Sequence, residues 1–312
     1  MPAAHLVSIA DLDAGQITKI LDGANRHHSL ADEPIKKLTT LRGRTVIILM
    51  FENSTRTRTS FELAAKRLSA EAINITGSSS STTKGETLVD TGKNMMAMYP
   101  DAIVVRHSYG GAAAMLADAV NCPVINAGDG IHEHPTQALL DVYTLRRRLG
   151  TLEGANIWIV GDVLHSRVAR SNILAFQAMG ATVTVAGPPT LLPRDVGALG
   201  VEVRTTLDDL READVVYALR MQRERMGESY VPSLREYAAA YQIDGRRLGA
   251  RQLLMHPGPV NRGVELSGDV VDSPQSLVLE QVAAGVVVRM AVLYEVLAQA
   301  RTGEPVTESQ HA

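Results

Sequence analysis

Cysteine is nearly absent from this chain of 312 residues, and Cys122 is the only one. A single cysteine excludes a disulfide within the chain and any zinc site of the CxxC type, and it is typical of a protein in a reducing compartment. Aromatic residues are also scarce, at 4%, whereas hydrophobic residues make up 45%. This composition excludes a disordered chain and is typical of an ordinary α/β protein with a packed core.

The chain also lacks an excess of positive charge and lacks long apolar runs. Its formal net charge of −3 and pI near 6.3 argue against a nucleic-acid binder, so any anion site must be local. No apolar run approaches the roughly 20 residues needed to span a bilayer, and the N-terminus has no basic region followed by an apolar core. We therefore expect a cytoplasmic protein with no membrane partner.

Short apolar runs rich in β-formers alternate with helical patterns along the whole chain. Such runs, bounded by helices, are typical of parallel sheets covered on both faces. A length of 312 residues suits two domains of about 150 residues each. The predicted fold is therefore α/β, with two doubly wound parallel-sheet domains and the active site in the cleft between them. The predicted strands are 45–51, 72–76, 102–107, 123–128, 156–162, 182–187, 201–205, 214–219 and 252–258.

A helix is predicted over 135–149, where a proline opens the first turn and Gly150 follows the end. We place the domain boundary near Gly150. A last helical stretch is expected over 274–301 and is longer than one domain needs. The predicted domains are 1–150 and 151–284, with a C-terminal helix over 285–302 that packs back on the first domain.

The stretch "FENSTRTRTSFE", residues 51–62, is unusually polar for the end of a buried strand. An apolar repeat at i, i+3, i+4 and i+7 runs from Phe61 to Leu68 and predicts a helix that begins near Ser54 or Thr55. The hydroxyls and arginines then lie at a helix N-terminus, where backbone N–H groups and the helix dipole favour an anion. Arginine adds a forked pair of donors, so phosphate is the expected ligand.

A purely structural explanation of the same stretch exists. Thr59 and Glu62 match the T-x-x-E capping box, in which case Arg56 and Arg58 would be solvated surface residues. Helical residues two apart also point about 200° away from each other, so the two arginines should not both reach one ligand. We expect Arg58 to be the structural one.

Polar residues follow several other predicted strands. Arg106 and His107 end one strand in "VVRHSYGG", and His134 and Gln137 open the predicted helix in "HEHPTQ". In doubly wound sheets ligands bind at the carboxyl ends of strands, so these groups can converge on one ligand. Each residue alone is also compatible with an ordinary surface position.

The well-known cofactor motifs are missing. His132 and His134 flank Glu133, but no HExxH and no third ligand at a recognisable spacing occur, so no metal is expected. Neither GxGxxG nor GxxxxGK[ST] is present, which excludes the common dinucleotide and NTP loops. The second half instead has Arg167 after one predicted strand and Arg220 with Gln222 after another. Two such arginines favour a substrate with carboxylates, although surface charges would look the same.

Taken together, these segments resemble the aspartate/ornithine carbamoyltransferase family over about residues 45–300. The motifs that carry the resemblance are "FENSTRTRTSFE", "SSSSTTKGETLVDT", "VVRHSYGG", "HEHPTQALLD", "GDVLHSRVARSN", "LRMQRER" and "LLMHPGPVNRGVEL". The sequence is most similar to the aspartate branch, because it has the lysine of "TTKGET" and lacks the H-C-L-P and S-M-G motifs of the ornithine branch. One departure is Gly258, where many relatives have leucine or alanine between the prolines.

The resemblance implies transfer of a carbamoyl group from carbamoyl phosphate to the α-amine of L-aspartate in pyrimidine biosynthesis, without a cofactor. It implies Arg56, Thr57, Arg106 and His134 as the catalytic residues. The implied carbamoyl-phosphate-binding residues are Ser54, Thr55, Arg56, Thr57, Ser81, Lys84, Arg106, His134, Gln137, Gly258 and Pro259. The implied aspartate-binding residues are Lys84, Arg167, Arg220, Gln222 and Gly258.

The family resemblance further implies a homotrimer in which Ser81 and Lys84 enter the active site of a neighbouring subunit. It leaves open regulatory chains or a dihydroorotase as further partners. Two alternatives to the aspartate enzyme are an enzyme of the same fold that acts on another amine, such as ornithine, and a catalytically silent scaffold. A silent chain should have lost groups such as Arg56, Lys84, Arg106 or His134, and all four are present.

Overall fold

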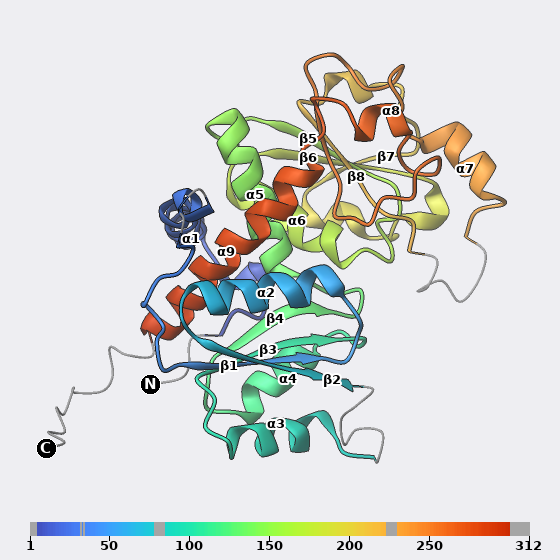
Figure 1. The fold of residues 1–312 in the computed structure, drawn as a ribbon. Helices are drawn as coiled ribbons and strands as arrows, with labels where there is room; N and C mark the ends of the chain where they lie inside the picture. The colour runs from blue at the N-terminus through green and yellow to red at the C-terminus, as the bar shows by residue number, and fades with distance from the viewer. Residues whose placement is uncertain (1–4, 32, 34, 78–84, 223–229, 300–312) are drawn as a thin grey trace, which may run out of the picture. The chain divides into compact units, whose positions relative to one another are not determined.

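The computed structural model describes residues 5–31, 33, 35–77, 85–222 and 230–299 (Figure 1). By internal contacts the chain forms two compact units. Unit 1 consists of Met1–Val7, Lys19–Ala127 and Val286–Ala312, and unit 2 of Ser8–Thr18 and Gly128–Gly285. The predicted boundary near Gly150 stays a prediction. No helix among the described residues is both long enough and apolar enough to cross a membrane.

All nine predicted strands are confirmed, each within a few residues of its expected ends. They are β1 Thr45–Met50, β2 Glu71–Thr76, β3 Ala102–His107, β4 Val124–Asp129, β5 Asn156–Val160, β6 Thr182–Ala186, β7 Glu202–Arg204, β8 Val215–Ala218 and β9 Leu253–Met255. The α helices of the described residues are α1 Ala14–His28, α2 Thr55–Arg67, α3 Leu88–Met96, α4 Ala112–Ala119, α5 Pro135–Leu149, α6 Arg167–Ala178, α7 Leu234–Tyr241, α8 Gly268–Val271 and α9 Val278–Gln299.

Unit 1 contains a parallel sheet of four strands in the order β2-β1-β3-β4. Helices α3 and α4 cover one face, and α2 with the last part of α9 lies on the other (Figure 1). The guanidinium of Arg289 in α9 stacks over the ring of Phe61 in α2, at 5.0 Å from the ring centroid. Cys122 is buried with the apolar side chains between α4 and the sheet. The predicted double winding is therefore confirmed for this unit.

Unit 2 contains a parallel sheet of five strands in the order β7-β6-β5-β8-β9. Trp158 and Val216 of adjacent strands face one core cluster, which includes Val270 of α8. Tyr217, the next residue along β8, lies on the opposite face near Phe176 of α6, with ring centroids 6.4 Å apart. Because successive strand residues point to opposite faces, these contacts show that both faces of the sheet are covered.

The strand orders place one topological switch point in each sheet. In unit 1 the chain leaves β1 toward β2 on one side and reaches β3 on the other, so the switch lies between β1 and β3. In unit 2 the switch lies between β5 and β8 for the same reason. Ligands of open parallel sheets bind outside the carboxyl ends of the strands at such points.

Candidate active site

The first group of predicted site residues lies at the N-terminus of α2, directly after β1. Ser54 is the N-cap residue, and its hydroxyl oxygen accepts a hydrogen bond from the backbone N–H of Thr57 at 3.4 Å and donates to Thr57 Oγ1 at 3.0 Å. Thr57 is buried, whereas Thr55 and Arg56 are exposed. The first turn of an α helix carries N–H groups without intrahelical acceptors and a partial positive charge. Ser54 to Thr57 therefore form a helix terminus suited to an anion.

The capping-box alternative does not describe this helix start. Ser54 caps the helix, and Thr59 lies inside α2. Glu62, the other half of the expected box, accepts hydrogen bonds from Lys66 Nζ at 2.5 Å and Asn74 Nδ2 at 2.9 Å. The hydrogen bond with Lys66 is the main cause of the lowered pKa of Glu62, and the charge of Arg58 adds to it. Arg58 therefore contributes to the charge balance of the helix surface.

Arg106 lies near the end of β3, in register with Met50, the last residue of β1. It is thus on the other side of the switch point of unit 1. The residue is 9% exposed, and its guanidinium donates to the carbonyl oxygen of Ala127 at 3.1 Å and to Glu52 Oε1 at 2.5 Å. Because two acceptors hold a planar fork, the guanidinium has a defined orientation.

Glu52 is a residue of this site that the sequence analysis missed. It stands in the turn between β1 and α2, and its carboxylate pairs with the guanidinium of Arg106. The available signal was an acidic side chain directly after a buried strand, next to the hydroxyls and arginines of the predicted anion site. Its partner Arg106 is 54 residues away in the sequence, so no local sequence pattern could predict this ion pair.

His134 is the N-cap residue of α5 and is buried, with 4% of its surface exposed. Its backbone N–H donates to Ser171 Oγ at 2.9 Å, and that hydroxyl donates to Glu133 Oε2 at 3.2 Å. The carboxylate of Glu133 also accepts from Ser8 Oγ at 2.5 Å and from the backbone N–H of Ile9 at 2.9 Å. The His-Glu-His segment thus fixes the start of α5 through its central carboxylate.

His132 has its own partner, since its Nδ1 lies 3.2 Å from Asp129 Oδ2. Within the described residues, no group of three or more His, Cys, Asp and Glu side chains is arranged to hold a metal ion. Gln137 lies in the first turn of α5 and is partly exposed, and its Nε2 donates to Asp141 Oδ1 at 3.0 Å.

The predicted carboxylate-binding residues follow the two strands that flank the switch point of unit 2. Arg167 is the first residue of α6, which follows β5, and is buried with 2% exposure. Arg220 follows β8, which pairs with β5, and its Nη1 lies 3.4 Å from Gln222 Oε1. Asp162 links the two strand ends, because its Oδ2 accepts from the backbone N–H of Gln222 at 3.1 Å and its Oδ1 pairs with His165 Nδ1 at 2.8 Å.

The "MHPGP" segment follows β9, the neighbour of β8. The Gly258–Pro259 peptide is cis, and Gly258 has a φ of 62°, a conformation that favours glycine. His256 Nδ1 accepts from the backbone N–H of Gly258 at 2.8 Å, and His256 Nε2 lies 3.2 Å from Glu265 Oε1. The side chain of His256 thus supports the backbone of the segment.

The predicted residues divide between the two units. Ser54, Thr55, Arg56, Thr57 and Arg106 belong to unit 1, whereas His134, Gln137, Arg167, Arg220, Gln222, Gly258 and Pro259 belong to unit 2. Ser81 and Lys84 lie outside the described residues, as does most of the loop predicted around them.

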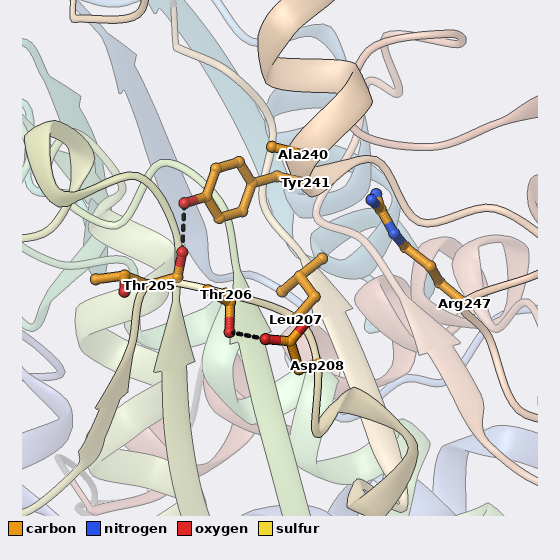
Figure 2. Close-up of a pocket in the computed structure, with 7 residues that line it drawn as sticks. All are labelled: Thr205, Thr206, Leu207, Asp208, Ala240, Tyr241 and Arg247. Atoms are coloured by element: carbon orange, nitrogen blue, oxygen red, sulfur yellow. Dashed lines mark hydrogen bonds between the residues drawn. The ribbon is translucent and has the colours of Figure 1, made fainter.

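A surface hollow in unit 2 contains none of the predicted site residues. Figure 2 shows that Tyr241 and Arg247 line it together with the segment 205–208. The Tyr241 hydroxyl donates to the carbonyl oxygen of Thr205 at 2.5 Å, and Arg247 donates to the carbonyl oxygens of Ala239 and Gln242. These polar groups serve the local backbone.

Two family models match successive parts of the chain. Residues 4–147 match the family model described as "Aspartate/ornithine carbamoyltransferase, carbamoyl-P binding domain", and residues 153–296 match "Aspartate/ornithine carbamoyltransferase, Asp/Orn binding domain". The chain is 56% identical to the aspartate carbamoyltransferase catalytic subunit of Salinispora arenicola over 300 residues, which cover 94% of this chain and 97% of the relative.

Two solved structures are also similar. The catalytic subunit of M. Jannaschii aspartate transcarbamoylase is 37% identical with a TM-score of 0.83, and the match covers 97% of this chain and 100% of that subunit. Aspartate transcarbamoylase from Trypanosoma cruzi, in complex with carbamoyl phosphate and aspartate, is 31% identical with a TM-score of 0.83, covering 94% of this chain and 96% of its own.

Proposed function

Because the chain belongs to the aspartate/ornithine carbamoyltransferase family, we propose that it transfers the carbamoyl group of carbamoyl phosphate to the α-amine of L-aspartate. The products are N-carbamoyl-L-aspartate and phosphate, in the pathway to pyrimidines. One observation carries the proposal: cationic and N–H donor groups follow the strands that flank the switch point of each sheet. Both reactants are anions, so a protein with a net charge of −3 must concentrate its cations where they bind.

In unit 1, we assign the phosphate to the start of α2. The exposed side chain of Arg56 supplies the principal cation, and the hydroxyls of Ser54 and Thr55 lie beside it on the same turn. Phosphate at a helix N-terminus gains from the backbone N–H groups and from the helix dipole together. Lys84 and Ser81, which lie outside the described residues, add a further cation and hydroxyl to this assignment.

The reaction begins when the neutral amine of aspartate attacks the carbonyl carbon of carbamoyl phosphate. Negative charge then develops on the carbonyl oxygen, and we assign Thr57, Arg106 and His134 as donors to it. Each preorganised donor of this kind contributes about 3 kcal/mol to the transition state. Arg106 is suited to the role because Glu52 and the carbonyl oxygen of Ala127 hold its guanidinium in place.

The tetrahedral intermediate collapses when the bond between the carbonyl carbon and the phosphate oxygen breaks. The leaving phosphate takes the bonding electron pair and accepts the proton lost by the amine nitrogen. No protein base is needed for this proton balance. We assign the remaining task, which is to hold the two reactants in line, to the groups that bind them.

In unit 2, we assign the two carboxylates of aspartate to Arg167, Arg220 and Gln222. Gln137 accepts a hydrogen bond from the carbamoyl NH₂ group, and the backbone at Gly258 and Pro259 holds the amine. The backbone conformation there is defined, because Gly258 donates its N–H to His256 Nδ1 at 2.8 Å. This set contains two guanidinium groups for a dicarboxylate, whereas the cationic side chain of ornithine would meet charges of its own sign.

The assignment is tested by supplying carbamoyl phosphate with aspartate and with ornithine side by side and by measuring both carbamoylated products. We expect product from aspartate only. Product from ornithine alone would overturn the aspartate assignment, and no product from either would overturn the transferase assignment.

We also propose a cytoplasmic homotrimer in which Ser81 and Lys84 complete the active site of a neighbouring subunit. The support for it is the family membership and the polar composition of the loop that carries both residues. The test mixes trimers of Arg56→Ala with trimers of Lys84→Ala and allows the subunits to exchange. Activity should return, because some mixed sites combine two intact contributions, and the sharing model fails if the mixture stays inactive.

A further inference from the structure

Asp141 is a fully buried carboxylate in α5, one helical turn after Gln137. Four side chains of unit 2 donate hydrogen bonds to it. Oδ1 accepts from Gln137 Nε2 at 3.0 Å and from Gln281 Nε2 at 2.7 Å. Oδ2 accepts from Asn172 Nδ2 at 2.9 Å and from the Tyr217 hydroxyl at 2.7 Å. An ionised carboxylate can accept all four, because its two oxygens offer about four lone-pair sites.

This arrangement determines which end of the Gln137 amide is available to a ligand. A carboxylate only accepts hydrogen bonds, so the branch of the amide that faces Asp141 must be the NH₂ group. The carbonyl oxygen, Oε1, is then the branch left for a ligand. Gln137 is partly exposed while Asp141 is completely buried, so the anchored end of the amide is the buried one.

We propose that Asp141 is a positioning residue that makes the enzyme select a carbamoyl group over an acetyl group. It does so by holding Gln137 with its carbonyl oxygen toward the NH₂ of carbamoyl phosphate. The inference rests on the proposed function, in which Gln137 binds that NH₂ group. The competing compound is acetyl phosphate, which has the same phosphate and carbonyl groups but a methyl group in place of the NH₂.

The selection follows from the difference between an NH₂ group and a methyl group. A methyl group cannot donate to Oε1, so acetyl phosphate leaves a fixed acceptor without its hydrogen bond. Sites built to hydrogen-bond a substrate group reject analogues that lack it, because the polar group of the protein is left unpaired. If Gln137 lost its anchor, its amide could turn away and the penalty against the methyl group would shrink.

The surroundings of Asp141 support an ionised acceptor at neutral pH. Burial raises its pKa to about 6, and the hydrogen bonds from the four donors oppose that rise. Tyr217 is the ionisable group among these four partners. Burial raises the pKa of the Tyr217 hydroxyl well above its ordinary value, so it stays protonated and donates.

A second route from Asp141 toward the substrate must be separated from this one. Gln281 donates to Asp141, and its Oε1 accepts from the backbone N–H of His256 at 3.0 Å. Loss of Asp141 could therefore act through the segment that includes Gly258. Changing Gln281 to methionine removes this link and leaves the contact between Gln137 and Asp141 in place.

The same contacts predict the outcome of a conservative change. In Asp141→Asn, one position keeps an acceptor oxygen and the other becomes an NH₂ donor. The amide of Gln281 cannot turn without losing its hydrogen bond with the backbone N–H of His256. Tyr217 can rotate its hydroxyl and Asn172 can turn its amide, so that each accepts a hydrogen bond instead of donating one. The oxygen of the new asparagine should therefore face Gln137 and Gln281, and Gln137 should keep its orientation.

The experiment is a competition in which the full-length enzyme meets aspartate with carbamoyl phosphate and acetyl phosphate in one mixture. Mass spectrometry measures N-carbamoyl-aspartate and N-acetyl-aspartate, whose ratio reports the ratio of the two kcat/KM values. In Asp141→Ala we expect the preference for the carbamoyl donor to fall by about tenfold, which corresponds to one lost hydrogen bond. Asp141→Leu, which leaves a smaller cavity, should show the same fall.

Three matched controls should keep the preference of the wild type within about twofold: Asp141→Asn, Tyr217→Phe and Gln281→Met. A purely structural role for Asp141 would lower both products alike and leave the ratio unchanged in Asp141→Ala and Asp141→Leu, which would overturn the proposal. An equal fall in Gln281→Met would also overturn it. Absence of N-carbamoyl-aspartate from the wild-type reaction would instead overturn the proposed function itself.

Discussion

The substitution Arg220→Leu gives a direct test of how the chain binds its acceptor substrate. Arg220 follows β8, is partly exposed, and places Nη1 3.4 Å from Gln222 Oε1. Leucine keeps much of the side-chain volume but removes the charge and every N–H donor. If the guanidinium binds a carboxylate of aspartate, the change should weaken aspartate binding and leave carbamoyl phosphate binding intact.

The size of the effect follows from the kind of contact. Hydrogen bonds to charged groups are worth about 1.5–3 kcal/mol each, which corresponds to roughly 10- to 150-fold in an equilibrium constant. Because Arg220 is partly exposed, water screens the pair and the lower half of this range applies. We expect the KM for aspartate to rise by about 10- to 30-fold, while the KM for carbamoyl phosphate changes by less than about twofold.

The assay measures initial rates with each substrate varied in turn, and then inhibition by succinate, a dicarboxylate without an amine. The Ki of succinate should rise by the same factor as the KM of aspartate, because only carboxylate binding is lost. Arg211→Leu is the matched control, since Arg211 is an exposed arginine of unit 2 that donates to the carbonyl oxygen of Arg246. An unchanged KM for aspartate, or an equal rise for carbamoyl phosphate, would refute the assignment.

Two further predictions concern the start of α2 and the buried carboxylate of α5. Arg56→Met should lower kcat/KM for carbamoyl phosphate by at least about tenfold and should weaken inhibition by inorganic phosphate. Arg58→Met should change kcat/KM and the phosphate inhibition constant by less than about threefold. Steady-state kinetics measures both quantities, and equal behaviour of the two variants would contradict the prediction. For Asp141, the pKa is about 6 in the folded protein against an ordinary value of 3.8, so the folded state holds this proton more tightly. Raising the pH from 4 to 7 should therefore lower the unfolding free energy of the wild type relative to Asp141→Asn by roughly 2 kcal/mol. Urea denaturation across this range measures the difference, and a constant or oppositely signed difference would contradict the buried, ionising carboxylate.

The sequence was sufficient to locate the regular elements because burial on both faces leaves a simple pattern. Continuous apolar runs marked the nine strands, and the proline and glycine around 135–149 marked both ends of α5. The ends of other elements were less certain, since α9 begins at Val278 rather than at residue 274. Local rules also competed at the start of α2, where Ser54 caps the helix although Thr59 and Glu62 fit a capping box better.

The candidate site was predictable where its residues stand directly after strands and not where they act through distant partners. Arg56 and Arg220 follow buried strands and Arg106 lies near the end of one, so strand periodicity alone indicated their place. Asp141 had no such signal, because its partners Asn172 and Gln281 lie 31 and 140 residues away. A buried carboxylate and a solvated one look the same in a helical pattern, and only the fold shows which donors surround it.

The position of Cys122 in the core has a practical consequence. Burial raises the pKa of its thiol to about 11, so roughly one molecule in a thousand carries the reactive thiolate at pH 8. The chain has no other cysteine. A cysteine introduced on the surface would therefore react with maleimide dyes or spin labels almost alone, and the native protein can serve as its own unlabelled background for fluorescence or distance measurements.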